Sequence, residues 1–255
     1  MLVPLSGEAV PYYSSQPAGA TLIFDRSRNF TTNLRSSSFR HCRMSASWLV
    51  PVGPASMQAL AIPEAEVYYD EHFLPDDEAT GIFDALLVKC SWERRKSVFK
   101  YPVPRDEAYY GDPGTHYTYS RRQYQPLRWI PELLSLRRRV EEATPASAYA
   151  NLNLRKLGYN AVLCNLYRDG NDSVALHADA EPEMGPVIAS LSLGAERLFR
   201  IKRHDGSVVF AEHLAHGSLF IMAGKTQLNF KHEAPKEPGI TRPRINLTFR
   251  HIEHR

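Results

Sequence analysis

The chain has 255 residues with a hydrophobic fraction of 43%, as expected of a soluble globular domain, and no run of about 18 apolar residues predicts a membrane-spanning helix. The net charge of +3 comes from residues 1–63, because the remaining 26 basic and 26 acidic residues cancel, so bulk charge gives no support for nucleic-acid binding by the rest. Three widely spaced cysteines, Cys42, Cys90 and Cys164, indicate a reducing compartment and argue against a disulfide framework or a thiolate zinc site.

The first 60 residues differ in composition from the rest. The segment "RSRNFTTNLRSSSFRHCRMSAS" is rich in Ser and Arg, lacks acids and shows no sustained period. This composition predicts that residues 1–60 form a disordered or poorly structured extension, part of which could precede a later start at Met44 or Met57. A targeting segment is the alternative, although such segments normally begin at the first residue. Residues 61–255 are expected to form the functional domain.

Two helices are predicted near the start of this domain. The segment "EVYYDEHF" is typical of a strand, and "PDDEATGIFDALLVKCSW" combines an Asp cap with helical apolar spacing. A second helix is predicted over "IPELLSLRRRVEEA", with Pro131 near its first position.

After residue 160 the pattern changes to short strands separated by Gly, Asp, Asn and Pro turns, and no further helix is predicted. The expected strands lie within residues 160–170, 173–179, 186–194, 196–203, 206–214, 217–224 and 244–252. Helices followed by many strands predict an α+β, mainly β fold: a double-sheet jelly roll braced by two or more N-terminal helices.

Two strands carry candidate site residues. His177 and Asp179 are two apart and can face one metal ion, but the two-His-one-carboxylate site of non-haem iron needs a second histidine. His232 is a candidate, although spacing alone leaves the choice open. The other downstream histidines are His204, His213, His216, His251 and His254.

The last predicted strand alternates in polarity. Arg244, Asn246, Thr248 and Arg250 share one face, and Ile245, Leu247 and Phe249 share the other, which belongs to a core. Two arginines facing inward need an anionic partner, and a dicarboxylate such as 2-oxoglutarate would suit their bidentate forks. The alternative is a surface strand with exposed arginines.

Several segments together resemble the AlkB family of iron(II)- and 2-oxoglutarate-dependent nucleic-acid dealkylases, in its DNA and RNA repair branch. The resemblance covers roughly residues 64–252 and rests on "VPRDEAYYGDPGTHYTYS", "NLYRDGNDSVALHADAE", "VIASLSLGAERLF", "HGSLFIMAGKTQLNFKHEAPKE" and "RPRINLTFR". It implies a double-stranded β-helix with His177, Asp179 and His232 on Fe(II), and with Arg244 and Arg250 on the carboxylates of 2-oxoglutarate. Asn165, Tyr167 and Asn246 would help to bind this cosubstrate, and O2 would be the oxidant.

The resemblance also implies a substrate site. A nucleotide-recognition lid is expected near residues 104–122, where Tyr109, Tyr110, Tyr117 and Tyr119 could hold a base that has left its stack. Glu181 is expected at the pocket mouth facing the base, and Arg197 near the active site. The expected partner is alkylated DNA or RNA, single-stranded or with a flipped base; we expect a monomer without membrane association.

The implied reaction is oxidative demethylation of bases such as 1-methyladenine and 3-methylcytosine, with succinate and formaldehyde as products. An AlkB-like oxygenase acting on protein or lipid is the alternative, and a nucleic-acid-binding sandwich that has lost its metal is a third hypothesis. The expected location is the cytoplasm in a bacterium, or the nucleus and cytoplasm in a eukaryote. Which lesion and which polymer are not determined by the sequence.

Overall fold

The computed structural model describes residues 57–96, 100–119, 122–150 and 158–253. The predicted extension therefore lies outside the described residues up to position 56. Its last residues belong to the fold, because β1 (Gln58–Ala59) pairs with β2 (Glu66–Asp70) in antiparallel register.

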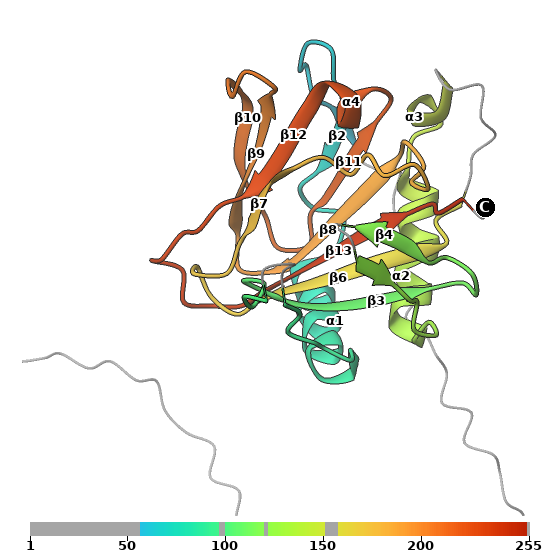
Figure 1. Ribbon diagram of the computed structural model, residues 1–255, viewed down its shortest axis with the longest axis vertical. Helices are drawn as coiled ribbons and strands as arrows, with labels where there is room; N and C mark the ends of the chain where they lie inside the picture. Colours follow the sequence, from blue (N-terminus) through green and yellow to red (C-terminus); the bar gives the residue numbers. More distant parts are fainter. Residues whose placement is uncertain (1–56, 97–99, 120–121, 151–157, 254–255) are drawn as a thin grey trace, which may run out of the picture. The chain divides into compact units, whose positions relative to one another are not determined.

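Eleven of the thirteen strands in the described residues form two antiparallel sheets (Figure 1). The larger sheet has seven strands in the order β1, β2, β11 (Leu219–Ala223), β8 (Ile188–Gly194), β13 (Arg244–Arg250), β6 (Ala161–Tyr167) and β3 (Asp106–Gly111). The smaller sheet has four, in the order β10 (Val208–Leu214), β9 (Arg197–Arg203), β12 (Phe230–Ala234) and β7 (Val174–His177). A separate pair is formed by β4 (Tyr117–Tyr119) and β5 (Arg122–Tyr124).

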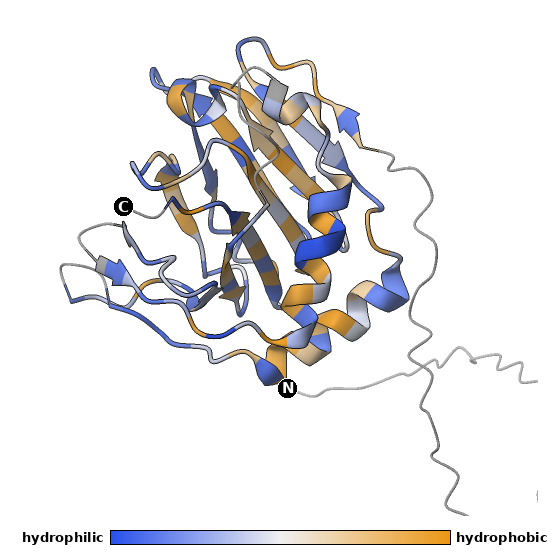
Figure 2. Cartoon of the chain, turned by 90° about the vertical axis from the view of Figure 1, so that its right-hand side faces the viewer, coloured by the Kyte–Doolittle hydropathy of each residue, from blue (hydrophilic) through white to orange (hydrophobic). Residues whose placement is uncertain are grey.

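The larger sheet is buried on both faces. On one face, Val162, Leu191 and Ile245 belong to a core cluster with Leu86 of α1 (Asp76–Lys89) and Leu136 of α2 (Pro131–Ala143). On the other face, Phe220 and Met222 of β11 pack with Phe199 and Ile201 of β9. Figure 2 shows hydrophobic and hydrophilic residues alternating along these strands. Two facing antiparallel sheets with helices outside the larger one form a jelly roll, which confirms the predicted fold class.

Several local predictions need correction. The N-cap of α1 is Pro75 and makes no side-chain capping hydrogen bond; Asp76 and Asp77 lie inside the first turn, where their charges favour the helix dipole. Pro131 is the first residue of α2, as predicted. Two one-turn helices, α3 (Ser147–Ala150) and α4 (Thr226–Asn229), were not predicted, because four residues are too few for an apolar periodicity.

Among the strands that were not predicted, β12 and β3 affect the site. The β12 strand carries only five residues between α4 and a proline-rich turn, so its alternation is short. The β3 strand occupies the first half of the expected lid and pairs with β6 at the edge of the larger sheet. Only the part of the lid after β3 therefore lies outside the two main sheets. No helix in the described ranges is long and apolar enough to cross a membrane.

Candidate active site

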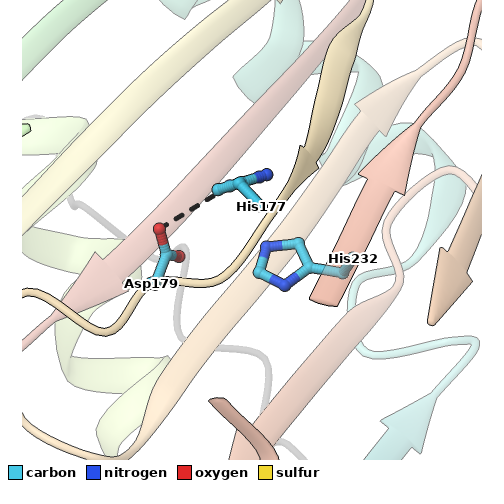
Figure 3. A group of neighbouring side chains, drawn as sticks. All are labelled: His177, Asp179 and His232. Carbon is cyan, nitrogen blue, oxygen red and sulfur yellow. Dashed lines mark ion pairs between the residues drawn. The ribbon is translucent and has the colours of Figure 1, made fainter. Parts of the chain in front are cut away.

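Three metal-ligating side chains converge between the two sheets (Figure 3). His177 ends β7, and its partner in the antiparallel pairing with β12 is His232. The centroids of the two imidazole rings lie 4.3 Å apart, and Asp179 follows two residues after the end of β7. Each of the three residues offers one ligand atom, and these atoms all lie within 4.8 Å of one another. Among the described residues, this is the one group of His, Cys, Asp or Glu side chains that could hold a metal ion.

The protonation of these side chains suits a metal. Burial lowers the pKa of His232 to about 3 and also lowers the pKa of His177, so both imidazoles are neutral near pH 7. Nδ1 of His177 contacts the carbonyl oxygen of Ala175 at 2.8 Å, and because a carbonyl only accepts, Nδ1 is the donor. Nε2, which lies 3.7 Å from Oδ1 of Asp179, therefore carries the lone pair that can bind a metal. Burial, the largest single influence, would raise the pKa of Asp179, but the electrostatic effects of Arg250, His177 and His232 and the hydrogen bond from Arg250 together outweigh it and keep the carboxylate ionised.

This donor set fits iron(II). Two neutral imidazoles and one carboxylate form the facial triad of non-haem iron(II) oxygenases, which leaves further coordination positions open. Asp179 is also held by its surroundings: its backbone N–H donates to Oε1 of Gln227 at 3.0 Å, and its Oδ2 accepts from Arg250 at 2.8 Å. The group is therefore oriented before a metal binds.

The floor of the cavity is the polar face of β13. Arg244, Asn246, Thr248 and Arg250 line it, whereas Ile245, Leu247 and Phe249 belong to the core on the helix side. The predicted division of this strand into two faces is confirmed. Both arginines are buried, at 2% and 4% exposure, so the surface-strand alternative is wrong. Register places Tyr167 opposite Arg244 and Asn165 opposite Asn246, and both β6 residues line the same cavity.

The two arginines leave donors for an anionic ligand. Arg244 donates to Oγ of Ser192 at 2.9 Å, and its guanidinium lies 5.2 Å from the ring centre of Tyr167. Arg250 donates to Asp179 and, at 3.2 Å, to the hydroxyl of Tyr117. The Nε atoms of both arginines are buried without a hydrogen-bond partner among the described residues. Unsatisfied buried donors are costly, and a dicarboxylate would satisfy them, so the site fits 2-oxoglutarate.

Sequence reasoning missed other residues that line the cavity or hold its side chains in place. Ser192 holds Arg244, and Ser190 accepts from Nδ2 of Asn246 at 2.7 Å. The alternation Ser190, Leu191, Ser192 was the available signal, since polar residues at period two in a buried strand need polar partners. Arg105 also lines the cavity; it precedes β3, and nothing in its local sequence indicated that it points inward.

The tyrosines of the expected lid occupy different places. Tyr117 lines the cavity and stacks on Tyr124, which was not predicted, with ring centres 4.9 Å apart. Tyr109 packs edge-on against Tyr117 at 5.2 Å. Tyr110 points to the opposite face of the sheet, into the helix-side core, where its hydroxyl accepts from the backbone N–H of Ser91. It therefore does not reach the cavity. The side chain of Tyr119 lies outside the described residues.

Arg197 and Glu181 do not line the cavity either. Arg197 is 1% exposed, and its guanidinium donates to the carbonyls of Asp169, Asp172 and Pro235 and pairs with Glu237. It holds two loops together and leaves no free face for a base. Glu181 is half-buried, and burial, followed by the charge of Asp179, raises its pKa. Its Oε2 is buried without a hydrogen-bond partner in the described part of the chain.

The other downstream histidines that were candidates for the metal are engaged elsewhere or lie outside the described residues. His204 contacts the carbonyl of Leu228, His213 pairs with Glu237, His216 contacts Thr80, and His251 contacts the carbonyl of Gly158. His254 lies outside the described residues.

Comparison with known proteins defines the class of the site. Residues 66–250 match the sequence model of the 2OG-Fe(II) oxygenase superfamily. Two named relatives are similar over much of the chain. The mouse "Alpha-ketoglutarate-dependent dioxygenase alkB homolog 3" is 39% identical over 195 residues, which cover 71% of this chain and 64% of that protein. The mouse "DNA oxidative demethylase ALKBH2" is 34% identical over 233 residues, 86% of either chain.

The chain therefore belongs to the 2OG-Fe(II) oxygenase superfamily and, within it, to the AlkB family. Iron(II), 2-oxoglutarate and O2 are the cofactor and cosubstrates of this family of dioxygenases, and His177, Asp179 and His232 are a group that could hold the metal ion here. A solved structure, "The structure of OsALKBH1", has a TM-score of 0.56 and 20% identity, covering 76% of this chain and 99% of its own. That likeness supports the fold alone. The chain spans 64% of the length of the alkB homolog 3 relative.

Proposed function

We propose that this protein removes N-methyl groups from bases of DNA or RNA by oxidation with O2, converting 2-oxoglutarate to succinate and carbon dioxide and releasing the methyl carbon as formaldehyde. The observation that carries this proposal is one cavity that joins His177, Asp179 and His232 to two buried arginines whose Nε donors have no partner among the described residues. Its support at the level of substrate is the similarity, over 86% of both chains, to a relative called a DNA oxidative demethylase.

One set of residues would hold the metal, and a second set would bind the cosubstrate. His177, Asp179 and His232 would hold the iron, which, with 2-oxoglutarate and O2, supplies the oxidation of a methyl C–H bond. Arg250 would bind the carboxylate nearer the metal and Arg244 the distal one, with Asn165, Tyr167 and Asn246 beside them on the cavity wall. The protein contributes positioning, charge and exclusion of water. The hydroxymethyl product loses formaldehyde without a catalytic side chain.

The base would have to leave its stack to reach this buried site, as a single strand or by flipping. Tyr117 and His177 both line the cavity, and their rings would be the surfaces nearest the base. Aromatic rings hold bases largely regardless of sequence, so this arrangement favours recognition of the lesion over its context.

Glu181 does not itself line the cavity, but it follows Asp179 by two residues, and it is proposed to select charged lesions. Methylation at N1 of adenine or N3 of cytosine fixes a positive charge on the ring, and a partly desolvated carboxylate favours such a cation. The buried, unpartnered Oε2 of Glu181 supports this role. We expect Glu181→Gln to lose more activity on 1-methyladenine than on a neutral etheno adduct, with metal and 2-oxoglutarate binding unchanged. Equal losses on both substrates would remove the charge-selection role.

The function is tested by measuring formaldehyde from oligonucleotides that carry 1-methyladenine or 3-methylcytosine, with and without 2-oxoglutarate. A panel of N-methylated peptides serves as the comparison, because the alternative substrate class is protein or lipid. We expect cosubstrate-dependent formaldehyde from the oligonucleotides. Turnover of 2-oxoglutarate with formaldehyde from peptides alone would overturn the proposal while leaving the enzyme class intact.

A further inference from the structure

Arg105 lies just before β3 and contacts Asn165, one of the cavity residues that would bind the cosubstrate. It is buried at 8% exposure and lines the same cavity as the metal group. Its Nε donates to Oδ1 of Asn165 at 2.9 Å, and its NH1 donates to the carbonyl of Ser173 at 3.3 Å. Its NH2 forms an ion pair with Oε1 of Glu107 at 2.7 Å. Each of the three guanidinium nitrogens therefore has a protein partner.

The hydrogen bond from Arg105 fixes the orientation of the Asn165 side-chain amide. A guanidinium has five N–H donors and no acceptor, so only the oxygen of the amide can face it. The NH2 group of Asn165 is consequently turned away from Arg105, and Asn165 lines the cavity beside Asn246, its partner in the β6–β13 register. Without a donor-only neighbour, an amide can rotate by half a turn and exchange the places of its oxygen and nitrogen.

We propose that Arg105 is a positioning residue for the cosubstrate: it locks the Asn165 amide so that its NH2, and not its oxygen, meets a carboxylate of 2-oxoglutarate. This inference rests on the proposed function, because it requires 2-oxoglutarate beside Asn165. The group that the Asn165 amide presents to the carboxylate decides whether it favours or opposes binding. An N–H donor attracts an anion, whereas an amide oxygen in the same place repels it.

The surroundings of Arg105 suit an orienting role better than direct anion binding. The charge of Arg105 is already balanced by Glu107, which is 1% exposed and also accepts a hydrogen bond from the Tyr124 hydroxyl at 2.9 Å. Through Ser173 the same guanidinium reaches the residue that precedes β7, the strand of His177. Arg105 therefore contacts three parts of the cavity at once: Glu107, which binds Tyr124; Asn165, which would meet the cosubstrate; and Ser173, which precedes the strand of His177.

The test is the affinity for 2-oxoglutarate, measured by calorimetry on the full chain loaded with Mn2+, which supports binding without turnover. We expect Arg105→Gln to weaken binding about tenfold or more, the scale of one hydrogen bond to a charged group. Asn165→Ala should cause a similar loss, and the double variant should lose no more than either single one, because both changes remove the same contact. Additive losses would overturn the positioning role.

A matched control and a second variant separate orientation from folding. Arg94→Gln removes the same charge from a neighbouring arginine that pairs with Asp106 and Asp172, and should leave the affinity unchanged. Asn165→Asp keeps an oxygen facing Arg105 but presents a second oxygen to the ligand, so it should keep its thermal stability and lose 2-oxoglutarate binding. Unchanged binding by Asn165→Asp would overturn the inference. Failure of the unmodified protein to bind 2-oxoglutarate would instead overturn the proposed function itself.

Discussion

Replacing Arg244 by methionine separates cosubstrate binding from stability, because this arginine is buried and forms no ion pair with any described residue. Its NH2 donates to the neutral hydroxyl of Ser192, and its Nε has no hydrogen-bond partner among the described residues. Burial lowers its pKa, which means that the folded, ligand-free protein disfavours the charged form. Arg250 on the same strand differs, since it forms an ion pair with Asp179.

Two magnitudes follow from this contrast. A carboxylate of 2-oxoglutarate left without Arg244 loses a buried charged partner, which costs about 3–5 kcal/mol, or roughly two to three and a half orders of magnitude in affinity. In the ligand-free protein, methionine of similar volume replaces a desolvated charge, so the free energy of unfolding should rise by about 1 kcal/mol or more. For a domain of this size that is about 2–4 °C in Tm.

Arg250→Met is the matched comparison. It too should abolish binding of 2-oxoglutarate, but it leaves the buried Asp179 carboxylate unpaired and should lower the free energy of unfolding by about 3–5 kcal/mol. The measurements are thermal unfolding of the chelator-treated protein and calorimetry with 2-oxoglutarate on the Mn2+-loaded protein. Arg244→Met that is destabilised as strongly as Arg250→Met would refute the account of Arg244 as an unpaired charge. An unchanged affinity would remove Arg244 from the cosubstrate site.

Three further predictions concern the metal, a close backbone contact and acid stability. His232→Ala should abolish Fe2+ binding measured by calorimetry, whereas His204→Ala, on a residue that contacts the carbonyl of Leu228, should retain it; the reverse result would show that the ligand set is misassigned. A Cβ on Gly170 would lie 1.6 Å from the carbonyl oxygen of Glu237, while one on Gly239 would meet nothing within 4 Å. Gly170→Ala should therefore destabilise the fold by at least about 1–3 kcal/mol and Gly239→Ala should not, as measured by Tm. The pKa of His232 is about 3 in the folded protein against an ordinary value of 6.5, so the unfolded chain binds more protons between these values, and stability present above pH 6.5 is lost as the pH falls. At pH 5 this group lowers the free energy of unfolding by about 2 kcal/mol. In denaturant unfolding of the metal-free protein, the free energy of unfolding of His232→Gln should therefore fall less steeply with decreasing pH than that of the unmodified protein.

The local pattern of the sequence determined the parts of the site that lie on single strands. In β13, residues two apart share a face, so the alternation of Arg244 to Arg250 with Ile245 to Phe249 already indicated a polar floor over an apolar core. The same period placed Asn165 with Tyr167 on β6. These inferences needed no knowledge of the neighbouring strands, because the pleat of one strand imposes them.

Relations between strands required the tertiary structure. His232 could not be chosen over the other histidines by spacing, and it is the register of β12 with β7 that sets it opposite His177. Tyr109 and Tyr110 are neighbours in the chain, yet only Tyr109 faces the aromatic cluster beside the cavity while Tyr110 enters the helix-side core. Arg105 precedes β3 and meets Asn165, sixty positions later, because β3 and β6 are paired. A sequence shows which way a side chain points relative to its own strand, but which side chain it meets there is set by pairing between distant segments, and that depends on how all the strands pack together.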